Sequence, residues 1–392
     1  MKKALEDIRV LEVAQYMAGP MCPRELGEMG AEIIKVEMPG VGDMMRSMPP
    51  FIDGQSYMFT LLNVNKKSIT LDLKKEKGAT IFKELVKKAD VVLENFAPGV
   101  MTRMGVDYKI LKRVNPRIIY CSVTGFGQYG PYSSFTAFDP VIQAAGGVMS
   151  AAQKPDSPPE WPGIAIADII GPLYATIGIL EALHYRDVTG EGQAVDISMH
   201  DAMWSLVSYT HLPRYWEART GIPAEKTMSA ATELSRCFKT EDGYIMVVPV
   251  SPQQQVNMLR AIGEGAREPE MGKAEFAKEF TISMDAWASS KTTSEVLEAL
   301  RGFRVPCAPV LRVEELVNDP HLRAREMTIE VPTTGSEDTK ILAPGVVVKL
   351  SESAGEIRVT PPLLGQHNEE VYSQLLGYTK EDLACLRDEG VI

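Results

Sequence analysis

The sequence has few cysteines and histidines, and neither type is clustered. Its five cysteines are widely dispersed without a Cys-x-x-Cys pair, and its five histidines never form a His-Glu-x-x-His pattern. This spacing argues against a zinc site and a disulfide framework, so we expect no bound metal. An odd number of dispersed cysteines is typical of reduced thiols, and it predicts a cytoplasmic protein.

Runs of positive charge and long apolar runs are also missing. The chain has 41 Lys and Arg against 52 Asp and Glu, a net charge of −11, and no more than two basic residues follow one another. No apolar run of membrane-spanning length is apparent. We therefore expect neither a nucleic acid nor a membrane as a partner.

The glycine-rich loops that bind phosphates are absent as well. The first strand–helix–strand pattern ends in Glu37, as a dinucleotide-binding unit would, but its turn reads Ala-Gln-Tyr-Met-Ala-Gly-Pro over residues 14–20. Without the Gly-x-Gly-x-x-Gly spacing the backbone cannot approach a pyrophosphate closely, and Pro20 removes an N–H from the helix start. Neither a Walker loop nor a Gly-x-Ser-x-Gly elbow occurs. The chemistry must therefore be sought in carboxylates.

What the sequence does contain is a regular alternation of strand and helix patterns. A length of 392 residues favours two domains. Short apolar strands alternate with amphipathic helices, which predicts a doubly wound α/β domain. The strands are expected at residues 8–13, 31–37, 68–73, 91–93, 118–123 and 193–198, and the helices at 21–29, 78–88 and 172–185.

Composition changes divide the rest of the chain. We expect a large domain over residues 1–211, a linker over 212–236, a small α+β domain over 237–310, a second linker over 311–345 and a C-terminal part over 346–392. The small domain is predicted from a hairpin with Asp242-Gly243 at its turn, followed by three helical patterns. The C-terminal part returns to strand and helix patterns.

One carboxylate, Asp168, follows a short apolar stretch, Ile-Ala-Ile-Ala over residues 164–167, and two more isoleucines follow it. A carboxylate that is poorly solvated in such a place is a better nucleophile than one on a wet surface. The alternative is a plain helix cap for the helix at 172–185, a position where Asp is common. The local pattern by itself favours the cap.

Nine motifs in a fixed order change that balance. They are Ala-Gly-Pro at 18–20, the segment 30–43, Asn-Lys-Lys-Ser-Ile-Thr-Leu-Asp at 65–72, Glu-Asn-Phe-Ala-Pro-Gly at 94–99, Gly-Phe-Gly-Gln-Tyr-Gly-Pro at 125–131, Ala-Asp at 167–168, Thr-Gly-Glu-Gly-Gln at 189–193, Asn-Asp-Pro-His-Leu at 318–322 and Leu-Gly-Gln-His at 364–367. Together they cover nearly the whole chain. With them the sequence resembles the class III CoA-transferases, the family that also contains the α-methylacyl-CoA racemases.

The resemblance implies a reaction and a nucleophile. It implies that Asp168 attacks an acyl-CoA thioester and that CoA passes to a carboxylic acid through an aspartyl-CoA thioester, with both acids and acyl-CoA as small-molecule partners. Gln15, Tyr16 and Met17 would line the substrate and oxyanion side of the site. Some relatives carry Gln where this chain has Met17, so another group must take that role here.

The resemblance also implies where CoA binds and how the chain assembles. CoA would be a substrate, held by Leu71, Lys74, Asn95, Phe96 and Arg103, with no tightly bound cofactor. The lysines at 66 and 67 are further basic candidates. The fold implied is a Rossmann-like large domain, built from the N- and C-terminal parts, plus the small domain. Two chains would form an interlocked homodimer.

Two alternatives remain at this stage. A racemase of the same fold needs a second acid–base group, and the racemases have a Gly-His-Asp segment where this chain has Ala-Phe-Asp, so Phe138 stands in place of the histidine. A CoA-binding protein without catalysis is the other alternative. The Met-rich segment 38–59 predicts either an adaptable acyl pocket or packing in the core or the dimer.

Overall fold

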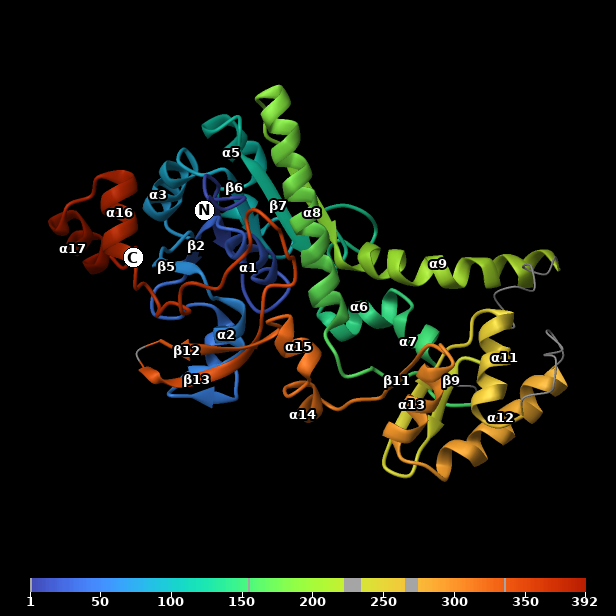
Figure 1. Ribbon diagram of the computed structural model, residues 1–392. Helices are drawn as coiled ribbons and strands as arrows, with labels where there is room; N and C mark the ends of the chain where they lie inside the picture. Colours follow the sequence, from blue (N-terminus) through green and yellow to red (C-terminus); the bar gives the residue numbers. More distant parts are fainter. Residues whose placement is uncertain (1, 154–155, 222–233, 265–273, 335) are drawn as a thin grey trace. The chain divides into compact units, whose positions relative to one another are not determined.

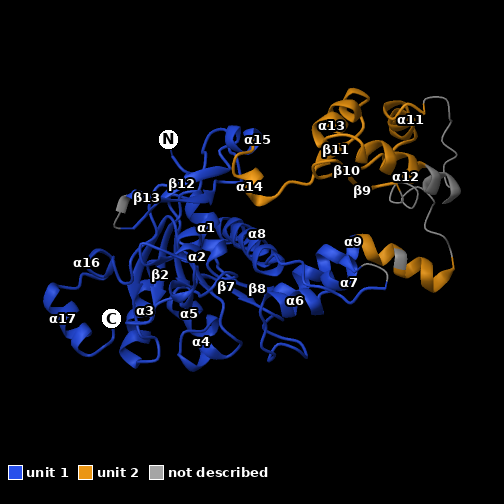
Figure 2. Cartoon of the chain, turned by 90° about the horizontal axis from the view of Figure 1, so that it is seen from below, with its two compact units in different colours: residues 1–209, 320–392 blue, residues 210–319 orange. Residues whose placement is uncertain are grey.

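The computed structural model describes residues 2–153, 156–221, 234–264, 274–334 and 336–392. The chain divides into two compact units, one made of residues 1–209 and 320–392 and the other of residues 210–319 (Figure 2). The larger unit contains the central sheet, and the sequence motifs at 318–322 and 364–367 lie at or within its C-terminal segment.

The central sheet of the larger unit has six strands, all parallel (Figure 1). Its order is β5 (Lys66–Thr70), β2 (Glu32–Glu37), β1 (Arg9–Val13), β6 (Val91–Glu94), β7 (Ile119–Thr124), β8 (Ala194–Ser198). The chain winds outward in one direction from β1 and then in the other from β6. The α/β fold with a parallel sheet is therefore confirmed, and a ligand crevice is expected beyond the carboxyl ends of β1 and β6, where the winding reverses.

Alternate residues of β1 point into two separate cores. Leu11 and Val13 pack on one face with helices α3 (Glu76–Val86), α5 (Tyr108–Val114), α16 (Asn368–Leu376) and α17 (Lys380–Asp388). Val10 packs on the other face with α1 (Met21–Glu28), α6 (Asp139–Ala145) and α8 (Ile166–Thr189). The C-terminal helices are fixed to the sheet by Tyr372, whose hydroxyl donates to the carbonyl of Thr70 at 2.7 Å.

Helix α8 is much longer than the sequence pattern suggested. It is long and apolar enough to cross a membrane, with a mean hydropathy of 1.5 over 18 residues, so the expectation that no apolar run has this length is wrong. One side of α8, with Ala175, Ile179 and Ala182, is fully buried against the sheet. A core helix of a globular domain has the same composition, and this packing accounts for it.

The region expected to be the second linker is structured. It contains α14 (Val313–Leu316), α15 (Pro320–Ala324) and a hairpin of β12 (Thr328–Thr333) and β13 (Ser336–Pro344). Val331 and Ile341 of this hairpin pack on Val64, beside α2 (Tyr57–Leu62), so chain segments far apart in sequence lie together (Figure 1). The hairpin's two strands pair with each other, with Thr333 opposite Ser336, whereas the residue on which they pack, Val64, lies far away in the sequence.

The region expected to be the first linker begins inside a helix. Helix α9 (Met199–Thr220) continues through Pro213, a residue that normally ends a helix, and residues 222–233 lie outside the described part of the chain. Other short elements of the larger unit are η1 (Met44–Ser47), β3 (Phe51–Ile52), β4 (Gln55–Ser56), α4 (Val100–Arg103) and α7 (Val148–Ala152).

Among its described residues, the smaller unit has an antiparallel sheet and three helices that pack on it, besides the C-terminal part of α9 and all of α14. The sheet order is β11 (Cys307–Pro309), β10 (Tyr244–Val247), β9 (Arg236–Lys239), and the helices are α11 (Pro252–Ala261), α12 (Ala274–Ser289) and α13 (Thr293–Gly302). The expected hairpin is present. The carboxylate of Asp242 in its turn accepts the backbone N–H of Thr293 at 2.7 Å, which joins the hairpin to α13.

Candidate active site

The loop after β1 is held in place by the loop after β6. The side chain of Asn95 accepts the N–H of Gln15 at 2.9 Å and donates to its carbonyl at 2.8 Å. A Cβ at Gly19 would lie 2.5 Å from the Ala14 Cβ and 2.7 Å from the Asn95 Cγ, so only glycine fits there. This close approach explains the Ala-Gly-Pro and Glu-Asn-Phe motifs, and it engages the amide of Asn95 with protein backbone.

A cluster of buried charges supports the same loop from behind. Lys35 lies 2.6 Å from Glu12 and 2.8 Å from Asp43, and all three side chains are fully buried. Asp43 accepts the N–H of Tyr16 at 2.9 Å, and Tyr16 has a left-handed backbone with φ of +61°. Burial alone would lower the pKa of Lys35, but Glu12 and Asp43 hold it above its ordinary value. We call Glu12, Lys35, Asp43 and Lys66 the buried ionic cluster.

Lys66 completes this cluster and does not face solvent. Its ammonium group lies 2.8 Å from Glu12 and donates to the carbonyl of Pro20 at 2.8 Å. Burial lowers the pKa of Lys66 to about 8. Lys67 is half-buried and pairs with Glu32 and Glu370, each at 2.8 Å. Neither lysine is therefore free to hold a CoA phosphate, contrary to the expectation from sequence.

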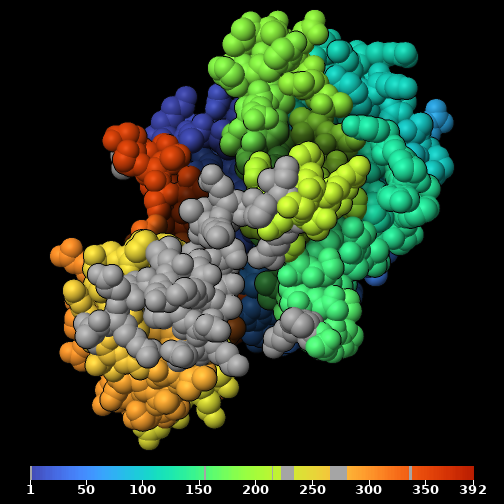
Figure 3. Space-filling model, turned by 90° about the vertical axis from the view of Figure 1, so that its right-hand side faces the viewer, coloured from blue at the N-terminus to red at the C-terminus, as the bar shows by residue number. Residues whose placement is uncertain are grey.

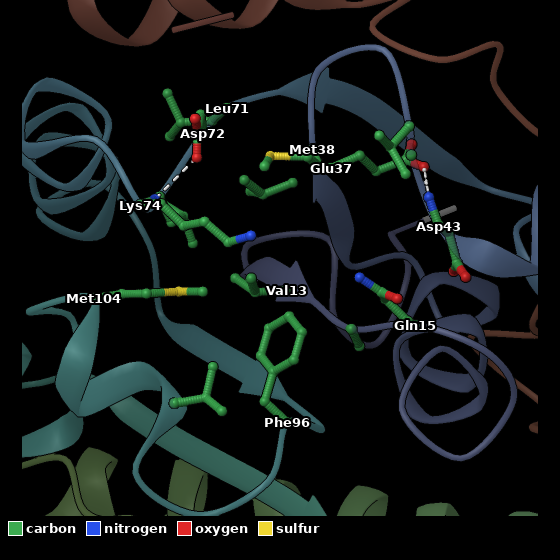
Figure 4. A pocket seen from close by; sticks show the side chains of 16 residues that line it. Val13, Gln15, Glu37, Met38, Asp43, Leu71, Asp72, Lys74, Phe96 and Met104 are labelled. Atoms are coloured by element: carbon green, nitrogen blue, oxygen red, sulfur yellow. Dashed lines mark hydrogen bonds between the residues drawn. The ribbon is translucent and has the colours of Figure 1, made fainter.

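Two cavities meet at the carboxyl ends of β1 and β6. The first, of about 400 Å³, lies over β1, β2 and the residues after β5 (Figure 4). Its lining includes Gln15, Met38, Leu71, Lys74 and Phe96, so it unites Leu71, Lys74 and Phe96 of the expected CoA-binding set. Lys74 is exposed at the rim.

The second cavity, of about 240 Å³, contains Asp168. Tyr16, Asn95 and Phe138 line it as well, together with Gln15 and Phe96. Because Gln15 and Phe96 line both cavities, the two are neighbours.

Two of the residues named from sequence line neither cavity. Met17 packs among Met45, Phe59 and Leu62 in a small core of its own. Arg103 is exposed at the end of α4, whose Val100 lines the first cavity. Met17 therefore has a packing role here, and part of the Met-rich segment packs with it.

Asp168 does not cap a helix. Helix α8 begins at Ile166, so Asp168 lies inside its first turn, and no side chain caps the helix from the Ala165 position. The cap interpretation is wrong because the helix starts earlier than residues 172–185 suggested. Instead, the carboxylate of Asp139 accepts the N–H groups of Ala167 at 2.7 Å and of Asp168 at 3.2 Å.

Asp139 is the site residue that sequence reasoning missed. It is 4 % exposed at the start of α6, and the side-chain amide of Gln143 donates to its carboxylate at 2.5 Å and to the carbonyl of Ile164 at 2.7 Å. Burial and the like charge of Asp139 raise the pKa of Asp168 to about 7. The only local signal was an acidic residue before proline, and its partner is 29 positions away.

The apolar surroundings of Asp168 differ from those expected. Ile164 is 60 % exposed, and Ile166, Ile169 and Ile170 are only partly buried. The apolar lining of the cavity comes from other elements: Phe96, Val123, Ala137, Phe138 and Met199.

Phe138 lies in the same cavity as Asp168, where a racemase would have its histidine. Its ring packs edge-on against Tyr16, with centroids 6.0 Å apart at 88°. Among the described residues no histidine lines this cavity. His200 comes near through its backbone N–H, which donates to the carbonyl of Gly125 at 2.9 Å, but its imidazole packs on Phe126 with centroids 5.5 Å apart.

Known proteins resemble this chain over nearly its whole length. The family model described as CoA-transferase family III matches residues 5–368. The chain belongs to CoA-transferase family III. It is 37 % identical to the formyl-CoA:oxalate CoA-transferase of Streptomyces coelicolor, over 100 % of this chain and 99 % of that one. It is 35 % identical to the succinyl-CoA–D-citramalate CoA-transferase of Chloroflexus aurantiacus, over 100 % and 98 %.

Solved structures also resemble this family III CoA-transferase in fold. A CAIB/BAIF family protein from Brucella suis superposes with a TM-score of 0.81 at 30 % identity, covering 96 % of this chain and 100 % of that one. The resemblance inferred from the nine motifs and the expectation of a CoA-transferase are both confirmed. CoA thioesters are the substrates of such enzymes.

Proposed function

We propose that this CoA-transferase moves CoA between two carboxylic acids through covalent intermediates on Asp168. The observation that carries the proposal is a carboxylate in the first turn of α8, directed by Asp139 and placed in a cavity beside the larger one. The named relatives act on formyl, oxalate, succinyl and D-citramalate groups. These names describe the relatives and not the acids that this chain uses.

Each of the two neighbouring cavities holds a different part of the CoA thioester. The nucleotide end lies in the larger cavity, with the ammonium of Lys74 at its rim near the phosphates. The pantetheine arm passes Gln15 and Phe96, which line both cavities, and brings the thioester to Asp168. The carboxyl ends of parallel strands at a winding reversal are the usual place for such a ligand.

The chemistry then proceeds in balanced steps. An Asp168 oxygen attacks the thioester carbon, the C–S bond breaks, and a mixed anhydride and CoA thiolate form. The thiolate attacks the carboxyl carbon of Asp168, the C–O bond breaks, and the donor acid leaves. The acceptor carboxylate attacks the resulting aspartyl-CoA thioester, and the first two steps run in reverse. Each step exchanges similar acyl groups, so covalent catalysis replaces one difficult step by easier ones.

Asp139 assists as a positioning residue. By accepting the N–H of Asp168 it fixes the first turn of α8, and its charge keeps the Asp168 carboxylate basic. The apolar lining from Phe96, Phe138 and Met199 limits water, which would hydrolyse an anhydride. Racemisation is not favoured, because Phe138 cannot exchange a proton.

Replacement of the nucleophile tests the mechanism. We expect Asp168→Asn to lower turnover at least about 10³-fold, because an amide cannot form the anhydride. Asp187→Asn is a matched control on the exposed side of the same helix, and it should leave turnover unchanged. With acyl-CoA and hydroxylamine, mass spectrometry should find a hydroxamate at Asp168 in the wild type only.

Two results would contradict the proposal. One is near-normal turnover by Asp168→Asn, and the other is trapping at a different residue. The same reactions in D₂O should leave the α-carbon unlabelled, since rapid α-deuteration without an acceptor acid would indicate a racemase.

A homodimer is part of the same proposal. Helix α8 exposes Leu173, Ile177 and Leu180, and α9 exposes Tyr209 and Trp216, with atoms of α9 visible at the surface in Figure 3. Exposed apolar side chains on two long helices favour cover by a second copy of the chain. Light scattering on dilution should find a persistent dimer, and a stable, active monomer would contradict this.

A further inference from the structure

Glu94, the last residue of β6, is a carboxylate to which the proposed mechanism gives no role. It is 3 % exposed, and among the described residues no cation pairs with it. Burial raises the pKa of Glu94 to about 7. Because a buried carboxylate without a cation is costly to the fold, such a group is expected mainly where it has a function.

The Glu94 carboxylate fixes the turn by which the chain leaves β6. One of its oxygens accepts the N–H of Phe96 at 2.7 Å, two residues further along the chain. Ser122 on the neighbouring strand β7 lies opposite Glu94 in the strand register, and a side-chain hydrogen bond from Ser122 opposes part of the rise in pKa. The bond to Phe96 therefore joins a carboxylate held between two central strands to the loop that follows β6.

The loop after β6 contributes to different cavities through different residues, all within the larger unit. Phe96 lines both the larger cavity and the Asp168 cavity, and its ring extends toward Val13 (Figure 4). Glu94 and Ser122 instead line a third cavity, of about 360 Å³. Since Glu94 lines neither of the first two cavities, its effect on a ligand there passes through the loop.

Three successive residues of this loop have separate tasks. Glu94 sets the turn, and Asn95 holds the loop after β1 by its two hydrogen bonds to the backbone of Gln15. Phe96 presents its ring to both cavities. A phenyl ring has no hydrogen-bonding group of its own, so the place of the Phe96 ring depends on its packing and on the backbone that Glu94 holds.

We propose that Glu94 is a positioning residue for CoA, because by accepting the N–H of Phe96 it fixes the ring beside which the pantetheine arm runs. This inference rests on the proposed function, which places CoA in the two cavities that Phe96 lines. The charge of the carboxylate makes this hydrogen bond stronger than one between neutral groups. Without the acceptor the loop is less ordered before CoA binds, and the entropy of ordering it then weakens binding.

Titration calorimetry on the full-length chain, with free CoA as the probe, tests this inference. Glu94→Leu removes the acceptor and keeps a side chain of similar size, so the Kd of CoA should rise at least about 10-fold. Glu94→Gln keeps an oxygen for the Phe96 N–H, and its Kd should stay within about 3-fold of the wild type. The number of sites per chain should not change, because misfolded protein lowers this number and leaves the Kd unaltered.

Ser122→Ala is the matched control for the surroundings of the carboxylate. It removes the contact from β7 and leaves the bond to Phe96, so the Kd of CoA should stay within about 3-fold of the wild type. Glu94→Met is a second variant without an acceptor, and its flexible side chain replaces that of Glu94→Leu if the leucine variant does not fold. Thermal unfolding verifies the folding of each variant.

The possible outcomes separate this inference from the proposed function. If the wild type binds CoA and Glu94→Leu binds it equally tightly, the inference is overturned and the aspartyl mechanism remains. The same follows if Ser122→Ala or Glu94→Gln weakens binding as much as Glu94→Leu does. If neither Glu94→Leu nor Glu94→Met folds while Glu94→Gln does, Glu94 supports the fold and the inference is overturned as well. A wild type that does not bind CoA overturns the placement of CoA in the proposed function, and this inference with it.

Discussion

Two groups of charged side chains lie near the loop after β1, and they are built in opposite ways. In the buried ionic cluster, Lys35 and Lys66 alternate with Glu12 and Asp43 at 2.6–2.8 Å. In the Asp168–Asp139 pair, two carboxylates share one helix terminus, and among the described residues no ion pair compensates either of them. The charges of the buried ionic cluster are compensated, whereas those at the proposed nucleophile are not.

The difference has consequences for both regions. A buried ion pair gives little net stability, but removal of one partner leaves an uncompensated buried charge and is costly. Two like charges destabilise the fold and raise the pKa of Asp168, and in the proposed mechanism this makes its carboxylate a better nucleophile. We therefore expect substitutions in the cluster to lower stability and those in the pair to alter activity and pH dependence.

The largest effect on stability should come from opening the cluster. Lys35→Met leaves Asp43 buried without its ion-pair partner and leaves Glu12 with Lys66 alone, so the free energy of unfolding should fall by about 3–5 kcal/mol. Lys67→Met is the control, because its ion pairs are half-exposed, and it should cost about 1 kcal/mol or less. Urea unfolding measures both. Equal losses of unfolding free energy in the two variants would show that the buried ion pairs of the cluster contribute no more to stability than the half-exposed ones of Lys67.

Removing a charge from the like-charge pair should instead raise the free energy of unfolding. The pKa of Asp168 rises from 3.8 to about 7 on folding, so the folded state binds more protons and its stability falls between about pH 4 and pH 7. Asp168→Asn, which cannot ionise, should therefore be more stable than the wild type at pH 8 by about 1–2 kcal/mol, after allowance for partial exposure. Below pH 4 the difference should vanish. A variant that is less stable at pH 8 would contradict this.

The smallest effect should be a shift of the pH profile. The wild type should lose kcat/KM as the pH falls below about 7, because Asp168 must be ionised to attack. Asp139→Asn removes the like charge and keeps an oxygen for the N–H groups, so the acid limb should move down by about half a unit to one unit. Asp139→Ala removes that acceptor too and should also lower kcat. If the acid limb of Asp139→Asn stayed where it is in the wild type, the charge of Asp139 would not be a cause of the raised pKa of Asp168.

Residues whose role depends on nearby sequence could be found without a structure. The Ala-Asp motif marked Asp168 as the candidate nucleophile, which stays a prediction, and Leu71, Lys74 and Phe96 of the candidate CoA-binding residues line one cavity. Lys66 was misjudged, because a lysine looks alike on a surface and in a core until its partners are known. Met17 was assigned to the site, but it packs in a small core.

The parallel α/β architecture was determined by the sequence itself, because apolar periodicity of strands and helices is a local property that survives folding. The nine motifs likewise fixed the family. Only the tertiary structure decided that Asp139 binds the first turn of α8 and that the hairpin of β12 and β13 packs on Val64. It also decided that Lys66, the first residue of β5, is buried and paired with Glu12. Each of these depends on groups brought together from distant parts of the chain, and burial then sets the charge and the pKa that no local pattern records.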